Sequence, residues 1–163
     1  MITAFGDNMT PYEIIHLDKI LVFLNEIGID LLLERLPNQT FLPGIAMRSG
    51  ILVIDLDKLS HVGDVLHEAG HLACMPSEIR ADMSDTLANT DINSGGEMMA
   101  MAWSFAVCKH LDLNPTIVFH EHGYKGAGKR LIESYEAGNG PGIPLLQWLG
   151  MCYDEKNASV NHE

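Results

Sequence analysis

Residues 64–73 read DVLHEAGHLA and contain the pattern H-E-x-x-H. Positions four residues apart lie on one face of an α-helix, so His67 and His71 can present their imidazole nitrogens to the same metal ion. Glu68 follows the first histidine directly, and from there its carboxylate can act as a general base without occupying a coordination position. The stretch therefore predicts a metal-binding helix.

The other residues of this stretch decide between two interpretations of the helix. Leu66, Ala69, Gly70 and Ala73 are small or apolar, which favours burial. Burying two histidines and a glutamate is costly unless they share a ligand, whereas an exposed helix would carry them simply as solvated side chains. We therefore favour the metal-binding interpretation.

The whole chain has the composition of an ordinary globular protein, with 163 residues of which 47% are hydrophobic and 20% charged. This length predicts a single domain over residues 1–163, with a core at about 11–153 and a polar C-terminal tail. The net charge of −12 and the lack of a basic run argue against nucleic-acid binding and suit a basic or neutral peptide substrate.

The sequence also bears on cellular location. Its N-terminus, MITAFGD, has neither the basic nor the apolar region of a signal peptide. The longest uncharged apolar run, residues 98–108, is too short to cross a bilayer. Cys74, Cys108 and Cys152 are odd in number and widely spaced, which is typical of reduced thiols. We expect a cytoplasmic protein that does not bind membranes.

The segment before the site helix predicts a helix and then a small sheet. Residues 10–13 read TPYE, a helix start with a capping box, and apolar residues then recur with helical spacing. Residues 29–36 favour a strand, and 44–48 with 51–55 favour a hairpin around Ser49-Gly50. An exposed edge of this sheet could hold an extended peptide by backbone hydrogen bonds.

The rest of the chain predicts mostly helices. We expect Asp57 or Ser60 to cap the site helix, and a polar, irregular loop over residues 75–93 to follow it. Further helices are expected over residues 97–111, 126–137 and 144–153. The predicted fold class is therefore α+β, mainly helical, with a small β-sheet preceding the H-E-x-x-H helix.

A catalytic zinc usually has three protein ligands, so a third must be found. Glu97 is our candidate, because it begins a nearly all-apolar helix in which an unpaired carboxylate would be costly. Ser94-x-x-Glu97 is also a capping box, which is the structural alternative. Glu78, Asp82 and Asp85, in the preceding loop, are the rival ligands.

With this spacing the chain resembles the gluzincin class of metallopeptidases. The H-E-x-x-H motif is followed by E-x-x-A-x-x-W-x-x-A at residues 97–106, a pattern most similar to the ImmA/IrrE-type branch, although Trp103 stands where Phe is usual. The resemblance covers about residues 11–112. It implies a zincin-like fold, cleavage of peptide bonds, Glu68 as general base, and Zn²⁺ bound by His67, His71 and Glu97.

Residues 120–124 read HEHGY and form a second polar cluster. In a peptidase, Tyr124 or His122 could donate a hydrogen bond to the oxyanion of the tetrahedral intermediate. Alternatively, His120 and His122 could lie on one face of a strand and bind a second ion, or the segment could be a polar surface loop.

These observations predict a zinc-dependent metallopeptidase that hydrolyses a peptide or protein substrate. The alternative is a non-catalytic zinc-binding domain that recognises a regulatory partner protein. Glu68 separates the two, because it is not expected to be a ligand. The substitution Glu68→Gln should abolish turnover in a peptidase and leave a binding domain unaffected.

Overall fold

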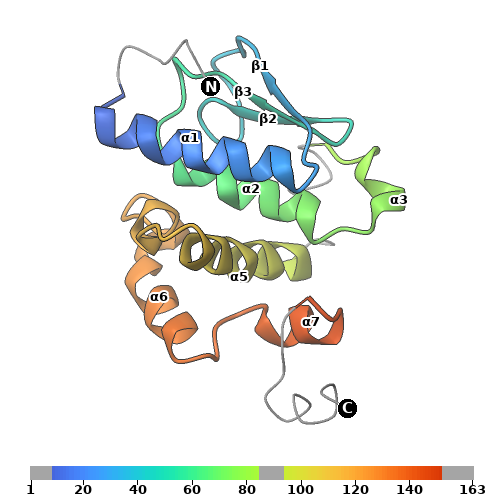
Figure 1. Ribbon diagram of the computed structural model, residues 1–163, viewed down its shortest axis with the longest axis vertical. Helices are drawn as coiled ribbons and strands as arrows, with labels where there is room; N and C mark the ends of the chain where they lie inside the picture. Colours follow the sequence, from blue (N-terminus) through green and yellow to red (C-terminus); the bar gives the residue numbers. More distant parts are fainter. Residues whose placement is uncertain (1–8, 85–93, 152–163) are drawn as a thin grey trace.

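The computed structural model describes residues 9–84 and 94–151. The elements, in chain order, are α1 (Pro11–Glu26), β1 (Leu31–Leu33), β2 (Ile45–Arg48), β3 (Ile51–Ile54), α2 (Gly63–Ala73), α3 (Ser77–Arg80), α5 (Ser94–His110), the 3-10 helices η2 (Pro115–Ile117) and η3 (Tyr124–Gly126), α6 (Gly128–Glu136) and α7 (Ile143–Trp148). The sheet lies with α1 and α2 in the upper part of Figure 1, α5 runs beneath α2, and α6 and α7 lie below α5. The predicted α+β class, mainly helical, is confirmed.

Helix α1 begins as its sequence predicts. The side-chain oxygen of Thr10 accepts a hydrogen bond from the backbone N–H of Glu13, and the Glu13 carboxylate accepts one from the backbone N–H of Thr10. This reciprocal pair satisfies donors that a helix end would otherwise leave without partners. The apolar stripe of Leu17, Ile20 and Leu24 is fully buried in the main hydrophobic core.

The three strands form one mixed sheet in the order β1-β3-β2. β2 and β3 are an antiparallel hairpin, and the two turn residues, Ser49 and Gly50, have φ of 51° and 77°. Positive φ at both positions is the two-residue turn that matches the twist of the strands, so the predicted hairpin is confirmed. β1 pairs with β3 in parallel and is shorter than the strand predicted over residues 29–36.

The start of α2 differs from the prediction. Neither Asp57 nor Ser60 caps this helix: Val62 occupies the cap position and makes no side-chain cap hydrogen bond. The first residue of α2, Gly63, packs against another segment instead. A Cβ at this position would lie 1.9 Å from the backbone oxygen of Ile117 in η2. Only glycine allows this close approach, which places the first turn of α2 against the segment that leads to residues 120–124.

Helices α2 and α5 pack closely enough to bring their backbones together. A Cβ on Gly70 would lie 2.9 Å from both the Cα and the backbone oxygen of Ala100. Gly70 lies between the two histidines of the motif, and Ala100 is one turn after Glu97. The small residues at this crossing therefore set the spacing between the predicted ligands of the two helices.

Three other segments differ from the sequence predictions. The loop predicted over residues 75–93 contains the short helix α3, and residues 85–93 lie outside the described residues. Residues 120–122 form a turn rather than a strand. α7 ends at Trp148 and not at 153, because the N–H groups of Gly150 and Met151 bond back to the last carbonyls of the helix.

Two predictions about the whole chain go beyond the described residues. The domain boundaries over residues 1–163 stay a prediction, and the predicted polar tail lies outside the described residues. Among the helices of residues 9–84 and 94–151, none combines the length and apolar character needed to cross a membrane.

Candidate metal centre

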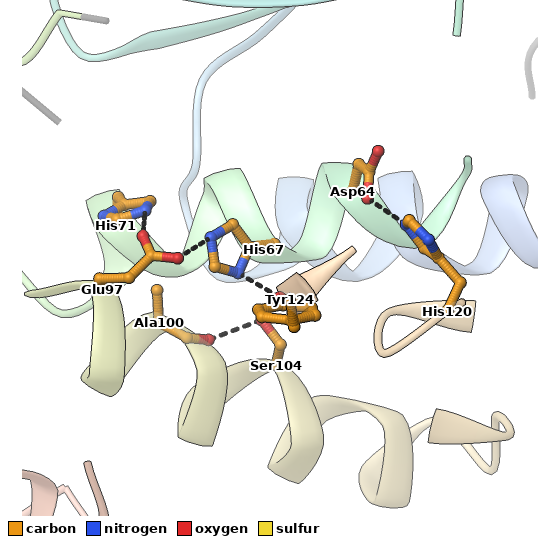
Figure 2. A network of polar contacts seen from close by, with 8 residues as sticks. All are labelled: Asp64, His67, His71, Glu97, Ala100, Ser104, His120 and Tyr124. Carbon is orange, nitrogen blue, oxygen red and sulfur yellow. Dashed lines mark hydrogen bonds and ion pairs between the residues drawn. The ribbon is translucent and has the colours of Figure 1, made fainter. Parts of the chain in front are cut away.

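The structure brings together the three residues that the sequence predicts as ligands. On α2, the Nε2 atoms of His67 and His71 lie 3.0 Å and 2.9 Å from the two carboxylate oxygens of Glu97 on α5. Figure 2 shows the carboxylate pointing between the two imidazoles, with one oxygen toward each ring. This group of two nitrogens and a carboxylate could hold a metal ion.

The three candidate ligand atoms lie close enough together to share one metal ion. Zinc binds imidazole nitrogen and carboxylate oxygen at roughly 2.0–2.2 Å, so two ligand atoms of a tetrahedral site stand roughly 3.3 Å apart. The separations of 3.0 Å and 2.9 Å run to different oxygens of Glu97, and one ligand atom from each of the three residues lies within 4.8 Å of the other two. The His71 side chain is 3% exposed and that of Glu97 is 44% exposed, so the group is buried on one side and open on the other.

Electrostatics favour the ionised form of Glu97. Burial opposes ionisation, but the hydrogen bonds and positive charge of the two histidines outweigh burial and hold the pKa of this carboxyl well below its ordinary value. For His67, burial favours the neutral ring, and the hydrogen bond and charge of Glu97 reverse that effect and raise its pKa. The carboxylate is therefore ready to receive a cation.

Tyr124 contacts the opposite side of the His67 ring. Its hydroxyl oxygen lies 2.8 Å from His67 Nδ1, so both nitrogens of this imidazole have partners (Figure 2). Burial, together with the charges of Glu97 and Asp64, raises the pKa of Tyr124 well above its ordinary value, so the hydroxyl stays neutral. A partner on the second nitrogen fixes the orientation of a metal-binding histidine.

The backbone of Tyr124 is in a conformation that bulky residues rarely adopt. Its φ is 55°, in the left-handed region, at the start of η3. Such strain persists only where the surrounding structure holds it, and it is common at functional sites. Here the conformation accompanies the contact between the Tyr124 hydroxyl and His67. The predicted role of Tyr124 as an oxyanion donor stays a prediction.

A second carboxylate–imidazole contact lies one turn earlier on α2. Asp64 Oδ1 is 2.9 Å from His120 Nε2, and the ring of His61 stacks on that of His120 with 3.8 Å between centroids. His120 Nδ1 is buried and has no hydrogen-bond partner among the described residues. His122 is exposed, with its ring centroid 5.6 Å from that of His61. Its predicted catalytic role also stays a prediction.

Other predicted candidates do not join the metal group. Glu78 on α3 and Asp82 after it are exposed, and Asp85 lies outside the described residues. His120 and His122 form no second group of converging ligand atoms in the described part of the chain, and their ring centroids are 6.4 Å apart. The prediction that these two histidines share an ion assumed that they lie on one face of a strand, whereas the structure has a turn there.

The alternative role of Glu97 as a helix cap does not account for its contacts, because both of its carboxylate oxygens lie against histidine nitrogens.

The sequence predictions assigned no role to Asp64, His61 or the loop at residues 41–43. Asp64 did carry a signal, since it lies one helical turn before His67 in the motif stretch. The loop residues carried none.

The metal group opens onto a cavity of about 540 Å³. Its walls come from the loop before β2, the start of α2, the first turns of α5 and the segment around residues 120–124. The lining residues are Phe41, Leu42, Pro43, Ser60, His61, Asp64, His67, Glu97, His120, His122, Gly123 and Tyr124. A substrate could reach the metal group through this cavity.

Comparison of the chain with protein-family models, with curated proteins and with solved structures finds no match. The resemblance to gluzincins therefore rests on the motif spacing.

Proposed function

We propose that this protein is a zinc-dependent metallopeptidase with a zincin-like fold, related in design to the gluzincins. The observation that carries the proposal is the convergence of both motif histidines on the carboxylate of Glu97, with separations of 3.0 Å and 2.9 Å. The order of elements supports it, because a small sheet precedes the H-E-x-x-H helix and the helix with the third candidate ligand packs against that helix.

His67, His71 and Glu97 would hold the ion, and two imidazoles with one carboxylate are a ligand set that suits zinc. When bound, zinc would supply a Lewis acid that activates water and polarises the scissile carbonyl group. Tyr124 would keep the His67 ring in its binding orientation through Nδ1. The open side of the group, where Glu97 is 44% exposed, faces the cavity that would admit the substrate.

Glu68 is the proposed general base. It follows His67 on α2, is 5% exposed, and its negative charge is one of the contributions that raise the pKa of His67. The carboxylate would take a proton from the attacking water and pass it to the leaving amine as the peptide bond breaks. We expect a peptide or protein substrate.

The experiment that tests this proposal compares native protein with Glu68→Gln after both are loaded with zinc. The measurements are zinc content and cleavage of a fluorogenic peptide library. We expect equal zinc content and a rate about 10²–10⁴-fold lower in the variant, the usual contribution of a general base. Exposed Glu78→Gln on α3 is the matched control and should keep both properties.

Two results would contradict the proposal. The first is native protein that binds zinc and cleaves no member of the library, which would favour the non-catalytic zinc-binding domain. The second is Glu68→Gln with an unchanged cleavage rate, which would mean that another group accepts the proton.

A further inference from the structure

The cavity beside the metal group has the size of a small-ligand pocket. Its volume of about 540 Å³ lies within the roughly 300–1,000 Å³ typical of such pockets. His67, Glu97 and Tyr124 line it on the metal side. A substrate group next to the scissile bond would therefore occupy this space.

The acidic side chains of the cavity already contact other residues of the protein. Two carboxylates line it: Glu97 is paired with His67 and His71, and Asp64 with His120 (Figure 2). Among the described residues, no lysine or arginine belongs to the lining. Although the whole chain has a net charge of −12, both carboxylates that line the described part of the cavity are already in contact with imidazoles, which leaves them less available to a basic side chain.

One wall is apolar and held in place. It consists of Phe41, Leu42 and Pro43, and the Phe41 residue is 66% exposed. The Thr40 hydroxyl donates to the Leu42 carbonyl at 2.6 Å, and Leu42 forms an isolated bridge with Ile45 at the start of β2. An apolar wall in a cavity of this size favours contact with an apolar part of a ligand.

The second wall is made of imidazole rings. His61 stacks on His120, which Asp64 holds through Nε2. Burial and the neighbouring His120 lower the pKa of His61, which favours the neutral form of its ring. Neutral imidazole faces stack favourably against other flat rings.

We infer that this cavity receives a bulky, uncharged and preferably aromatic side chain of the substrate, held between the Phe41 wall and the His61–His120 stack. The inference rests on the proposed function, since it assumes that a peptide reaches the metal group. It narrows the substrate class, because the net charge alone would suit a basic or neutral peptide of any side-chain size.

The test measures binding rather than turnover, by calorimetry on zinc-loaded protein. The three probes are acetohydroxamate, a phenylpropionyl hydroxamate and a guanidinoalkyl hydroxamate, which share a zinc-binding head and differ in the attached group. Burying a phenyl group should tighten binding by roughly 10–100-fold relative to acetohydroxamate. The guanidinoalkyl probe should bind no more tightly than acetohydroxamate.

Matched variants locate the effect. Phe41→Ala should reduce the preference for the phenyl probe over acetohydroxamate by about fivefold or more. Tyr12→Ala removes an aromatic side chain that is 69% exposed on α1 and does not line the cavity, so the preference should persist.

The outcomes separate the inference from the proposed function. If all three probes bind equally, or the guanidinoalkyl probe binds most tightly, the inference is wrong and the metal site stands. If the zinc-loaded protein binds none of them, no open metal position exists, and the proposed function fails together with the inference.

Discussion

Two carboxylate–imidazole contacts lie along the same helix and differ in their surroundings. Glu97 meets two imidazoles and its side chain is 44% exposed, whereas Asp64 meets one and its side chain is 10% exposed. The first contact joins α2 to α5, and the second joins α2 to the turn at residues 120–122. An ion needs several converging donors and an open side, and only the Glu97 contact offers both.

The histidines of the two contacts differ as well. His67 is held at both ring nitrogens, by Glu97 and by Tyr124. His120 is held at Nε2 by Asp64, and its Nδ1 has no partner within residues 9–84 and 94–151. The comparison indicates that Glu97 belongs to the metal group, while Asp64 positions a wall of the cavity.

The largest expected effect comes from replacing each carboxylate by its amide. Glu97→Gln should raise the dissociation constant for zinc by more than about 100-fold, because it removes an anionic ligand and not only an outer partner. Asp64→Asn should change the constant by less than about tenfold, the lower end of outer-partner effects. Competition with a chromophoric chelator measures both. Equal losses would mean that Asp64 also serves the ion.

A smaller effect should follow from disturbing the contact between α2 and α5. In Gly70→Ala the new Cβ meets Ala100 at 2.9 Å, so the free energy of unfolding should fall by about 1–3 kcal/mol, and zinc affinity should fall with it. Gly95→Ala is the control, since its Cβ would meet only Leu145 Cδ1, at 3.6 Å. Chemical denaturation measures the stability. An unchanged Gly70→Ala protein would show that this crossing does not set the ligand spacing.

Tyr124→Phe tests whether the second nitrogen of His67 matters. Loss of the 2.8 Å contact should weaken zinc binding by about tenfold, because the ring is then free to turn. Tyr135→Phe removes a comparable hydrogen bond, from the hydroxyl to the Pro141 carbonyl at 2.7 Å, which involves none of the three metal-group residues. It should cost about 1 kcal/mol of stability and leave zinc affinity unchanged. Equal zinc affinity in the two variants would remove Tyr124 from the site.

The smallest expected effect concerns the acid stability of the fold and a third carboxylate, that of Asp55, which accepts hydrogen bonds from backbone N–H groups. Burial raises the pKa of Asp55, but hydrogen bonds from the N–H groups of Leu36 and Asp57 outweigh burial. The pKa of Asp55 therefore lies below its ordinary value of 3.8. The ionised form therefore stabilises the fold above about pH 3.8, and this contribution disappears as pH falls through the lowered pKa. Asp55→Asn should reduce the loss of stability in acid by about 1 kcal/mol. If stability falls equally in acid in the native protein and in Asp55→Asn, Asp55 does not contribute to the pH dependence of stability.

Sequence reasoning located the metal group because helix geometry is local. His67 and His71 are one turn apart, and Glu97 drew attention as a carboxylate on an apolar helix. The hairpin and the start of α1 were predictable for the same reason, since turn and cap rules involve only a few neighbouring residues.

The cavity walls were beyond such reasoning. Phe41, His61 and His120 come from loops whose paths depend on packing between distant segments, and Asp64 meets a partner 56 residues later in the chain. The cap of α2 was predicted wrongly because close packing at Gly63 replaced the local signal. Burial patterns identify helices, but they do not indicate which loops meet.

The most direct test is the metal content of the purified protein, measured by elemental mass spectrometry with Glu97→Ala and Asp82→Ala alongside. We predict about one zinc per chain in the native protein and in Asp82→Ala, and a loss of zinc in Glu97→Ala. Native protein that holds no metal even after zinc is supplied, or Glu97→Ala that keeps its zinc, would contradict the metal centre built on His67, His71 and Glu97.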